Sequence, residues 1–294
     1  MAKMVPGLLF LMAAGGLAGQ AGFSQDTFPA TNGDVTITFV GHGTLVLQWG
    51  PIVVHVDPVG EYADYAKLPK ADLVLVTHDH FDHLDASAIE AVRKQGTEIV
   101  LTAKCAAKVK GTVMANGDRR TFKGITVEAV PAYNIKHERS AGKPFHPKGE
   151  GNGYILTLGG LRIYVAGDTE NTPEMKALTA IDVAFLPMNL PYTMTPEMAA
   201  DAALAFKPKV LYPYHYGDTE PKRLTALLAG FGLPTKIAGL GAPAVFDTFR
   251  LDKKAVGGVP RLVLLTAIGQ AEWGRQVPPR MLRAALRGIG ATAC

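Results

Sequence analysis

The stretch THDHFDHLD, residues 77–85, decides how this 294-residue chain is interpreted. It places three histidines and three aspartates directly after a nearly continuous apolar run at residues 73–76. Such a run is typical of a strand that is covered on both faces. A solvated loop would not need this many imidazole and carboxylate groups directly after a buried strand. Because zinc, iron and manganese accept these groups as ligands, the stretch predicts a metal site at a strand end.

The extended backbone of this stretch decides which side chains can share an ion. Residues two apart in an extended chain point the same way, so His78 and His80 can bind one ion from one side. The turn that follows brings Asp82 and His83 to a neighbouring position. The stretch therefore favours two adjacent ions rather than one.

Two ions need further ligands, and two other strand ends supply candidates. Asp168 follows the apolar strand predicted at residues 161–165, and one carboxylate can bridge two metals that lie about 3.5–4 Å apart. His215 follows the strand predicted at residues 210–214. Because both residues occupy strand ends, we expect them to share one rim with residues 77–85.

Period-two alternation and apolar runs between glycine turns predict short strands around this rim. The predicted strands cover residues 35–40, 44–48, 52–56, 73–76, 99–102, 125–130, 154–158, 161–165, 183–186 and 210–214. Helices are predicted from a cap at Asp85 to about Gln95, from a cap at Thr195 with Pro196 in its first turn, and over residues 221–230. Strand runs followed by helices, twice, predict an α/β fold with two packed sheets and helices outside.

Composition excludes several other classes of protein. With 48% hydrophobic and 19% charged residues, the chain is globular, and its two cysteines cannot build a disulfide framework or a thiolate-only metal site. The net charge of +4 is carried by four arginines after Gly274, where there is no acid. A basic tail is not a nucleic-acid-binding face, so we expect no nucleic-acid partner. The sequence also has no Gly-x-Ser-x-Gly elbow, which argues against a serine nucleophile.

Both ends of the chain are expected to lie outside the main domain. Residues 1–24 are predicted to be an export signal, because Lys3 precedes an apolar run and a peptidase could cut after Ala21. The alternative, an uncleaved membrane anchor, is disfavoured by Pro6 and several glycines in so short a run. We expect a periplasmic or secreted protein that contacts a membrane only through this segment, if it is uncleaved. Residues 253–294 are expected to be a poorly ordered basic extension, in which residues 262–265 could form one more strand.

The histidine stretch, with GDT at residues 167–169 and PYHY at residues 213–216, resembles the metallo-β-lactamase fold superfamily. VGHG at residues 40–43 and YTMT at residues 192–195 are similar to the branch that contains ascorbate-phosphate lactonases and N-acyl phosphatidylethanolamine phospholipase D. The resemblance implies a four-layered αβ/βα sandwich with a dinuclear site between its sheets. On this basis, residues 25–252 are expected to form a metallo-hydrolase domain.

The resemblance also implies the ligands of each metal, with Asp168 bridging the two. Those of the first metal would include His78 and His80, and those of the second would be Asp82, His83 and His215.

The first ligand set departs from the common pattern, which has a third histidine after the strand predicted at residues 125–130. This chain has Asn134 in that place. Either its amide is a weak ligand, or His146 reaches in from the following loop, with His137 as a third candidate. We favour His146, because the glycine-rich stretch after it allows close backbone approach.

Four other residues near this predicted site can be assigned a role from the sequence. His42 resembles a residue that lines the site in this branch, or is a surface turn residue. Asp57 is expected to hydrogen-bond a ligand histidine, or to cap a turn. Lys148 is expected to hold a substrate carboxylate or phosphate, or to be solvated. His55, inside an apolar strand, is expected to be packed and not to bind metal.

The implied cofactor is a pair of divalent metal ions, zinc in the first place, with manganese or iron as alternatives. Bound water falls from a pKa of 15.7 to roughly 7, so we expect a metal-bound hydroxide to attack a small ester, lactone or phosphodiester. Asp82 would orient this nucleophile or accept its proton. The alternatives are an iron-dependent oxidoreductase on the same fold and a metal-binding protein without turnover.

Overall fold

The computed structural model describes residues 22–216, 261–267 and 270–276. The chain divides into two compact units, residues 1–233 and residues 234–294. Residues 1–21 of the predicted export signal and the helix predicted at residues 221–230 lie outside the described residues, whereas Ser24, the last residue of that predicted signal, begins the first strand of the structure. The boundaries expected for the main domain, residues 25–252, therefore stay a prediction.

The first sheet of the larger unit has seven strands in the order of the sequence. Its first four strands are antiparallel neighbours, whereas β4 to β7 run parallel. The strands are β1 (Ser24–Phe28), β2 (Val35–Gly41), β3 (Thr44–Trp49), β4 (Ile52–Val56), β5 (Leu73–Leu75), β6 (Glu98–Leu101) and β7 (Thr112–Val113).

The second sheet has six strands in the order β15-β14-β13-β12-β9-β8. In it, β13, β14 and β15 run parallel, and β12 is antiparallel to both β9 and β13. The strands are β8 (Arg119–Phe122), β9 (Ile125–Ala132), β12 (Gly151–Leu158), β13 (Leu161–Val165), β14 (Val183–Pro187) and β15 (Val210–Tyr214). Between β9 and β12, the short strands β10 (Glu138–Ser140) and β11 (Lys143–Pro144) form a separate hairpin.

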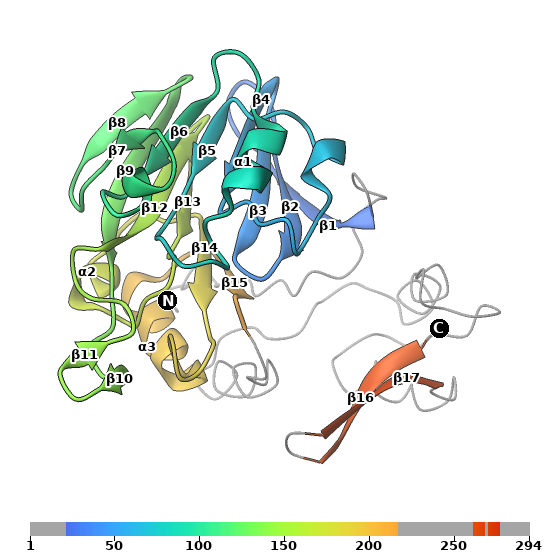
Figure 1. Cartoon of the computed structure of the whole chain (residues 1–294), viewed down its shortest axis with the longest axis vertical. Coiled ribbons are helices and arrows are strands. Elements are labelled where there is room, and N and C mark those ends of the chain that lie inside the picture. Colours follow the sequence, from blue (N-terminus) through green and yellow to red (C-terminus); the bar gives the residue numbers. More distant parts are fainter. Residues whose placement is uncertain (1–21, 217–260, 268–269, 277–294) are drawn as a thin grey trace, which may run out of the picture. The chain divides into compact units, whose positions relative to one another are not determined.

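The two sheets share one apolar core and each carries helices on its outer face (Figure 1). Buried side chains of both sheets, among them Ile37, Leu75, Leu156 and Phe185, form the shared core. Each such side chain contributes about 2 kcal/mol when it is removed from water. The first sheet is covered by η2 (Tyr65–Lys67), α1 (Ala86–Val92) and η3 (Cys105–Ala107), and the second by α2 (Pro173–Lys176) and α3 (Pro196–Phe206). The predicted αβ/βα sandwich is thereby confirmed.

The helices begin at their predicted caps. The Asp85 side chain accepts hydrogen bonds from the first turn of α1, and Thr195 does the same for α3. However, α1 ends at Val92, short of the expected end near Gln95. The chain has to turn at Gly96, where φ is +82°, in order to enter β6. This turn uses the residues that the longer helix would have contained.

The strand directions decide where the functional loops meet. The carboxyl ends of parallel strands lie at the same edge of a sheet, so the loops after β4 and β5 are neighbours, and the loops after β13, β14 and β15 lie at one edge of the second sheet. The two sheets are also joined near this edge. The Asn152 backbone N–H donates to the Thr77 carbonyl at 2.9 Å, and the Tyr154 hydroxyl donates to the Val76 carbonyl at 2.9 Å. Loops from both sheets therefore meet at one rim.

In the smaller unit, β16 (Arg261–Ala267) and β17 (Gln270–Gln276) form an antiparallel hairpin, and the strand suggested at residues 262–265 lies inside β16. Across the described parts of both units, no helix has the length and apolar character needed to span a membrane.

His55 is packed inside β4, as expected. Its side chain is fully buried, and its Nε2 donates to the Pro69 carbonyl at 2.9 Å. Burial lowers the pKa of His55 from 6.5 to about 4, and the hydrogen bond to Pro69 opposes this shift only in part.

We expect His55 to make the fold sensitive to acid between pH 6.5 and about 4. In this window the unfolded chain binds a proton that the folded chain does not, so the free energy of unfolding falls as the pH falls. The variant His55→Gln keeps an N–H donor but does not titrate. Between about pH 7.5 and about pH 4.5, wild type should lose about 2–3 kcal/mol relative to this variant in urea denaturation. An equal stability difference at both pH values would contradict this origin of acid sensitivity.

Candidate metal centre

Four side chains from three loops form a first cluster at the rim. His78 and His80 follow β5, Asp168 follows β13, and His146 follows the β10–β11 hairpin. Each offers a ligand atom, and these atoms all lie within 4.8 Å of one another. The His146 Nε2 is 3.3 Å from both His80 Nδ1 and Asp168 Oδ2, and the His78 Nε2 is 3.9 Å from the same carboxylate oxygen. This arrangement can hold one metal ion.

A second cluster beside it contains His42, Asp82, His83 and His215, again with ligand atoms within 4.8 Å. The Nε2 atoms of His83 and His215 are 3.0 Å apart. Asp82 Oδ2 is 3.6 Å from His215 Nε2 and 3.1 Å from His42 Nε2. His42 therefore lies in the site and not on a free surface turn.

Asp168 stands between the two clusters. Its Oδ1 is 3.3 Å from the Nε2 atoms of both His83 and His215, whereas its Oδ2 faces His78 and His146. One carboxylate thus directs one oxygen to each cluster. This is the position expected for a bridging ligand.

The donor set fits a pair of cations. Among the described residues, His78 Nε2 and Asp168 Oδ1 are buried and have no hydrogen-bond partner. In its neutral form His83 donates its Nδ1–H to Asp57, so its Nε2 lone pair faces His215 at 3.0 Å. Buried polar atoms without partners cost free energy, and divalent cations would satisfy all of them.

Asp57 orients one of the candidate ligands, as expected. Its Oδ1 accepts a hydrogen bond from the Thr77 backbone N–H at 2.8 Å. Its Oδ2 accepts hydrogen bonds from the Thr77 hydroxyl at 2.6 Å and from His83 Nδ1 at 2.7 Å. All three residues are fully buried. Asp57 therefore fixes both the ligand loop and the ring orientation of His83.

The backbone is strained around the second cluster. His42, Asp57 and His215 all adopt left-handed conformations, with φ between +45° and +51°. Such conformations cost on the order of 1 kcal/mol or more each and concentrate at functional sites. The two loops support each other, because the His215 backbone N–H donates to the His42 carbonyl at 3.0 Å.

The absence of a side chain at Gly43 leaves space for two imidazole rings of the second cluster. A Cβ at this position would lie 2.8 Å from His83 Cε1 and 3.4 Å from His215 Cδ2. No side chain fits there while the two imidazoles keep their places.

Asn134 does not act as a ligand in this arrangement. Its Oδ1 accepts hydrogen bonds from the His146 backbone N–H and from His146 Nδ1, both at 2.8 Å. Its Nδ2 donates to Glu170 Oε1 and to the Tyr192 carbonyl. Both the oxygen and the nitrogen of the Asn134 amide are therefore occupied by hydrogen bonds within the protein. The bond to His146 Nδ1 directs His146 Nε2 toward the first cluster. His137, the other candidate, pairs with Glu170 at 2.7 Å instead.

Sequence reasoning missed Glu170, which supports this part of the site. It is fully buried, and its carboxylate accepts hydrogen bonds from three consecutive backbone N–H groups as well as from Asn134. Burial alone would raise the pKa of Glu170, but these hydrogen bonds lower it. Its only signal in the sequence is its place two residues after Asp168.

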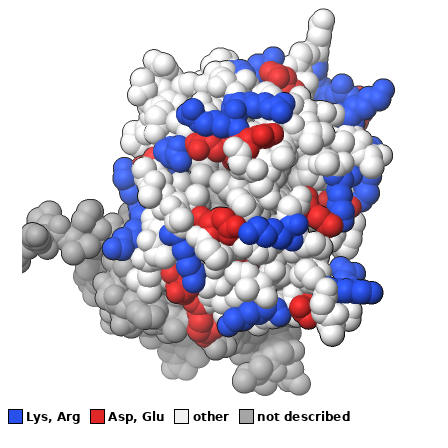
Figure 2. All heavy atoms as spheres, turned by 90° about the vertical axis from the view of Figure 1, so that its left-hand side faces the viewer, with Lys and Arg blue, Asp and Glu red and all other residues white. Residues whose placement is uncertain are grey.

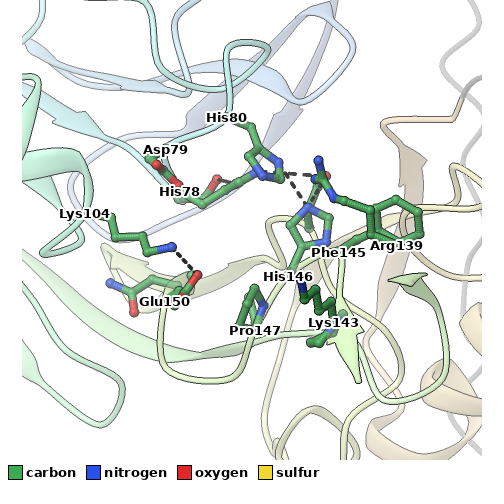
Figure 3. Close-up of a pocket in the computed structure, with 16 residues that line it drawn as sticks. His78, Asp79, His80, Lys104, Arg139, Lys143, Phe145, His146, Pro147 and Glu150 are labelled. Carbon is green, nitrogen blue, oxygen red and sulfur yellow. Dashed lines mark hydrogen bonds and ion pairs between the residues drawn. The ribbon is translucent and has the colours of Figure 1, made fainter. Parts of the chain in front are cut away.

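Lys148 is not brought to either cluster. It forms an ion pair with Glu174 at 2.7 Å and lies over the Tyr133 ring at 4.7 Å. Of the two interpretations of Lys148, the structure favours the solvated one, because its side chain is 59% exposed and forms this surface ion pair. A cavity of about 310 Å³ lies beside the first cluster (Figure 3). Three other cationic side chains line this cavity: Lys104, Arg139 and Lys143.

Burial and neighbouring groups shift the pKa values of the site residues in opposite directions. Burial lowers the pKa of His78 well below its ordinary value. Burial acts in the same direction on His83, but the carboxylates of Asp168 and Asp57 raise the pKa of His83 well above 6.5. Burial would raise the pKa of Asp82, yet hydrogen bonds with His215 and His42 lower it.

The fold and the two clusters define a sandwich protein with a paired metal-binding centre. The family model described as the beta-lactamase superfamily domain matches residues 36–215. The chain therefore belongs to the metallo-β-lactamase fold superfamily, as the resemblance implied.

Three relatives are similar over most of the described larger unit. A solved structure from Parabacteroides distasonis, described as a metal-dependent hydrolase, is 51% identical, with a TM-score of 0.68, and the match covers 72% of this chain and 96% of that one. A UPF0173 metal-dependent hydrolase of Thermococcus kodakarensis is 34% identical over 201 residues, which are 64% of this chain and 87% of the relative. A third, from Symbiobacterium thermophilum, is 32% identical over 225 residues, or 71% and 95% of the two chains.

We expect Asn134→Ala to weaken one metal site and leave the other intact. Without the amide, His146 Nδ1 loses its acceptor, so the affinity for one equivalent of zinc should fall by about 10–100-fold. Competitive zinc titration of the metal-free protein measures both equivalents. Asn171→Ala, which removes a surface hydrogen bond to Asp201, serves as the control. Two unchanged affinities in Asn134→Ala would contradict the role given to this amide.

We also expect zinc binding to release protons and to strengthen as the pH rises. Because the pKa of His83 is raised in the metal-free protein, a cation must displace a proton from it at neutral pH. Calorimetric titrations in buffers of different ionisation enthalpy measure this release directly. Binding without proton release at neutral pH would show that His83 is already neutral.

Proposed function

We propose that the protein is a metal-dependent hydrolase that works with two divalent cations, zinc in the first place. The observation that carries the proposal is the position of Asp168, whose two carboxylate oxygens face different clusters. The relatives from Parabacteroides distasonis and Thermococcus kodakarensis, described as metal-dependent hydrolases, support the same class.

In this proposal the two clusters divide the ligands. His78, His80 and His146 would hold the first cation, Asp82, His83 and His215 would hold the second, and Asp168 would contact both. When bound, such a pair activates water as a nucleophile and polarises the oxygen of the carbonyl or phosphoryl group whose carbon or phosphorus is attacked.

The chain's own residues would prepare the site for this chemistry. The Asp82 side chain is 21% exposed, so it can contact water, and its Oδ2 lies 3.1 Å from His42 Nε2. Its low pKa keeps it ionised at neutral pH, and it can therefore orient a nucleophile through hydrogen bonds that its carboxylate accepts. Asp57 and Asn134 hold the rings of His83 and His146 in place. Little reorganisation is then needed during the reaction.

We propose a small ester, lactone or phosphodiester as the substrate. A cavity of about 310 Å³ beside the first cluster suits a small molecule, at the lower end of the range for ligand pockets. We further propose export through residues 1–24 and no nucleic-acid partner, since the net positive charge is concentrated in the tail.

Removing one ligand of the first cation tests the proposal. Zinc-loaded wild type should hydrolyse bis(p-nitrophenyl) phosphate or members of a lactone panel, and His80→Ala should lose at least about 100-fold in kcat/KM. Its zinc content should also fall from two equivalents toward one. His55→Gln, which changes a buried histidine away from both clusters, should match wild type at neutral pH.

Three outcomes would contradict the proposal. Equal activity of wild type and His80→Ala would remove the metal centre from the reaction. Purification with iron and oxidation of a substrate would favour the oxidoreductase. Two bound metals without turnover of any probe would favour a metal-binding protein.

A further inference from the structure

The geometry points to a second binding element, a site on the β10–β11 hairpin for an anionic group of the substrate. This inference rests on the proposed function and narrows its substrates. They would carry a carboxylate or a phosphate at some distance from the bond that is cleaved.

The cavity beside the first cluster joins metal ligands to cations. His78, His80, His146 and Asp168 line one part of it. Figure 3 shows the hairpin residues Arg139 and Lys143 around the same cavity, together with Phe145 and His146. A molecule in this cavity would therefore meet the metal centre and the hairpin at once.

Two of the three cations that line the cavity have no carboxylate partner among the described residues. Lys104 is paired with Glu150 at 2.5 Å, and Asp79 is 3.6 Å from Lys108. By contrast, no carboxylate among the described residues lies within 4.0 Å of Arg139 or Lys143. Figure 2 shows cationic and anionic side chains side by side over one face of the molecule. Unpaired cations at a cleft raise the local concentration of anions.

The hairpin is held firmly relative to the first cluster. Three hydrogen bonds between Asn134 and His146, one at 2.9 Å and two at 2.8 Å, close the base of the loop that carries the hairpin. Buried Glu170 holds the loop's first residues through their backbone N–H groups. A cation on this loop therefore has a set position relative to His146.

Arg139 is also oriented by its own contacts. Its guanidinium lies 5.6 Å from the centre of the Phe145 ring, and that ring packs edge-on against Tyr192 at 5.0 Å. A guanidinium can bind a carboxylate or phosphate through two parallel hydrogen bonds, which fixes the direction of the bound group. The anionic group would be held on the hairpin while the cleavable bond lies at the metals.

Matched probes test the site without turnover. Butyrate, glutarate and phosphonobutyrate share a carboxylate that can bind the metal pair, but only the last two carry a second anionic group. Calorimetry with the zinc-loaded protein should show that at least one of these two binds about tenfold more tightly than butyrate. The probe with the larger advantage tells whether the hairpin prefers a carboxylate or a phosphate.

The variant Arg139→Gln/Lys143→Gln should reduce this preference to less than about threefold, while its zinc content stays that of wild type. Arg119→Gln removes an exposed arginine that does not line the cavity, and it should keep the preference. The single variant Lys143→Gln, at an exposed position, should reduce the preference for the dianionic probes in part. It replaces the double variant in this test if the double variant loses zinc.

A wild type that does not distinguish the probes would overturn the inference, as would a preference that survives in the variants. Lack of hydrolysis would not affect these measurements. A protein that binds no zinc would instead reject the proposed function.

Discussion

The hydrogen bonds that converge on the buried carboxylate of Asp57 hold the metal centre to the first sheet. An unpaired buried carboxylate costs several kcal/mol, so Asp57 can occupy this place only because Thr77 and His83 satisfy both of its oxygens. The constraint also acts in the other direction. Neither the start of the ligand loop nor the His83 ring can move without exposing that charge to an apolar interior. The end of β4 thereby determines the geometry of the loop after β5.

On the second sheet, a buried carboxylate orients a candidate ligand through an intervening side chain. Glu170 holds the backbone after β9 and the amide of Asn134, and Asn134 in turn holds His146. Each sheet thus contributes one carboxylate that never touches the metal positions but orients a histidine that does. The Asp57 network also reaches the first cluster, because the Thr77 hydroxyl lies 3.0 Å from His78 Nδ1. A change at Asn134 is therefore the more selective way to perturb one cluster.

Local chemistry made much of this structure predictable. The Asp85 and Thr195 caps depend on residues within one turn, and the strand-end positions of Asp168 and His215 follow from the strand pattern. The choice between Asn134, His137 and His146 depended on a loop that closes on itself twelve residues later. Similarly, no local signal tells that Arg139 and Lys143 face the cavity while Lys148 meets Glu174. Tertiary contacts alone decide such cases.

Gly43 shows that a metal centre can require an empty space as much as a ligand. Its backbone lies outside the left-handed region, so the turn itself does not demand glycine. What demands it is the volume occupied by the His83 and His215 rings. Anyone who grafts this centre onto another scaffold would have to copy that vacant volume along with the ligands. A template of ligand atoms alone would accept backbones that leave no room for the imidazoles.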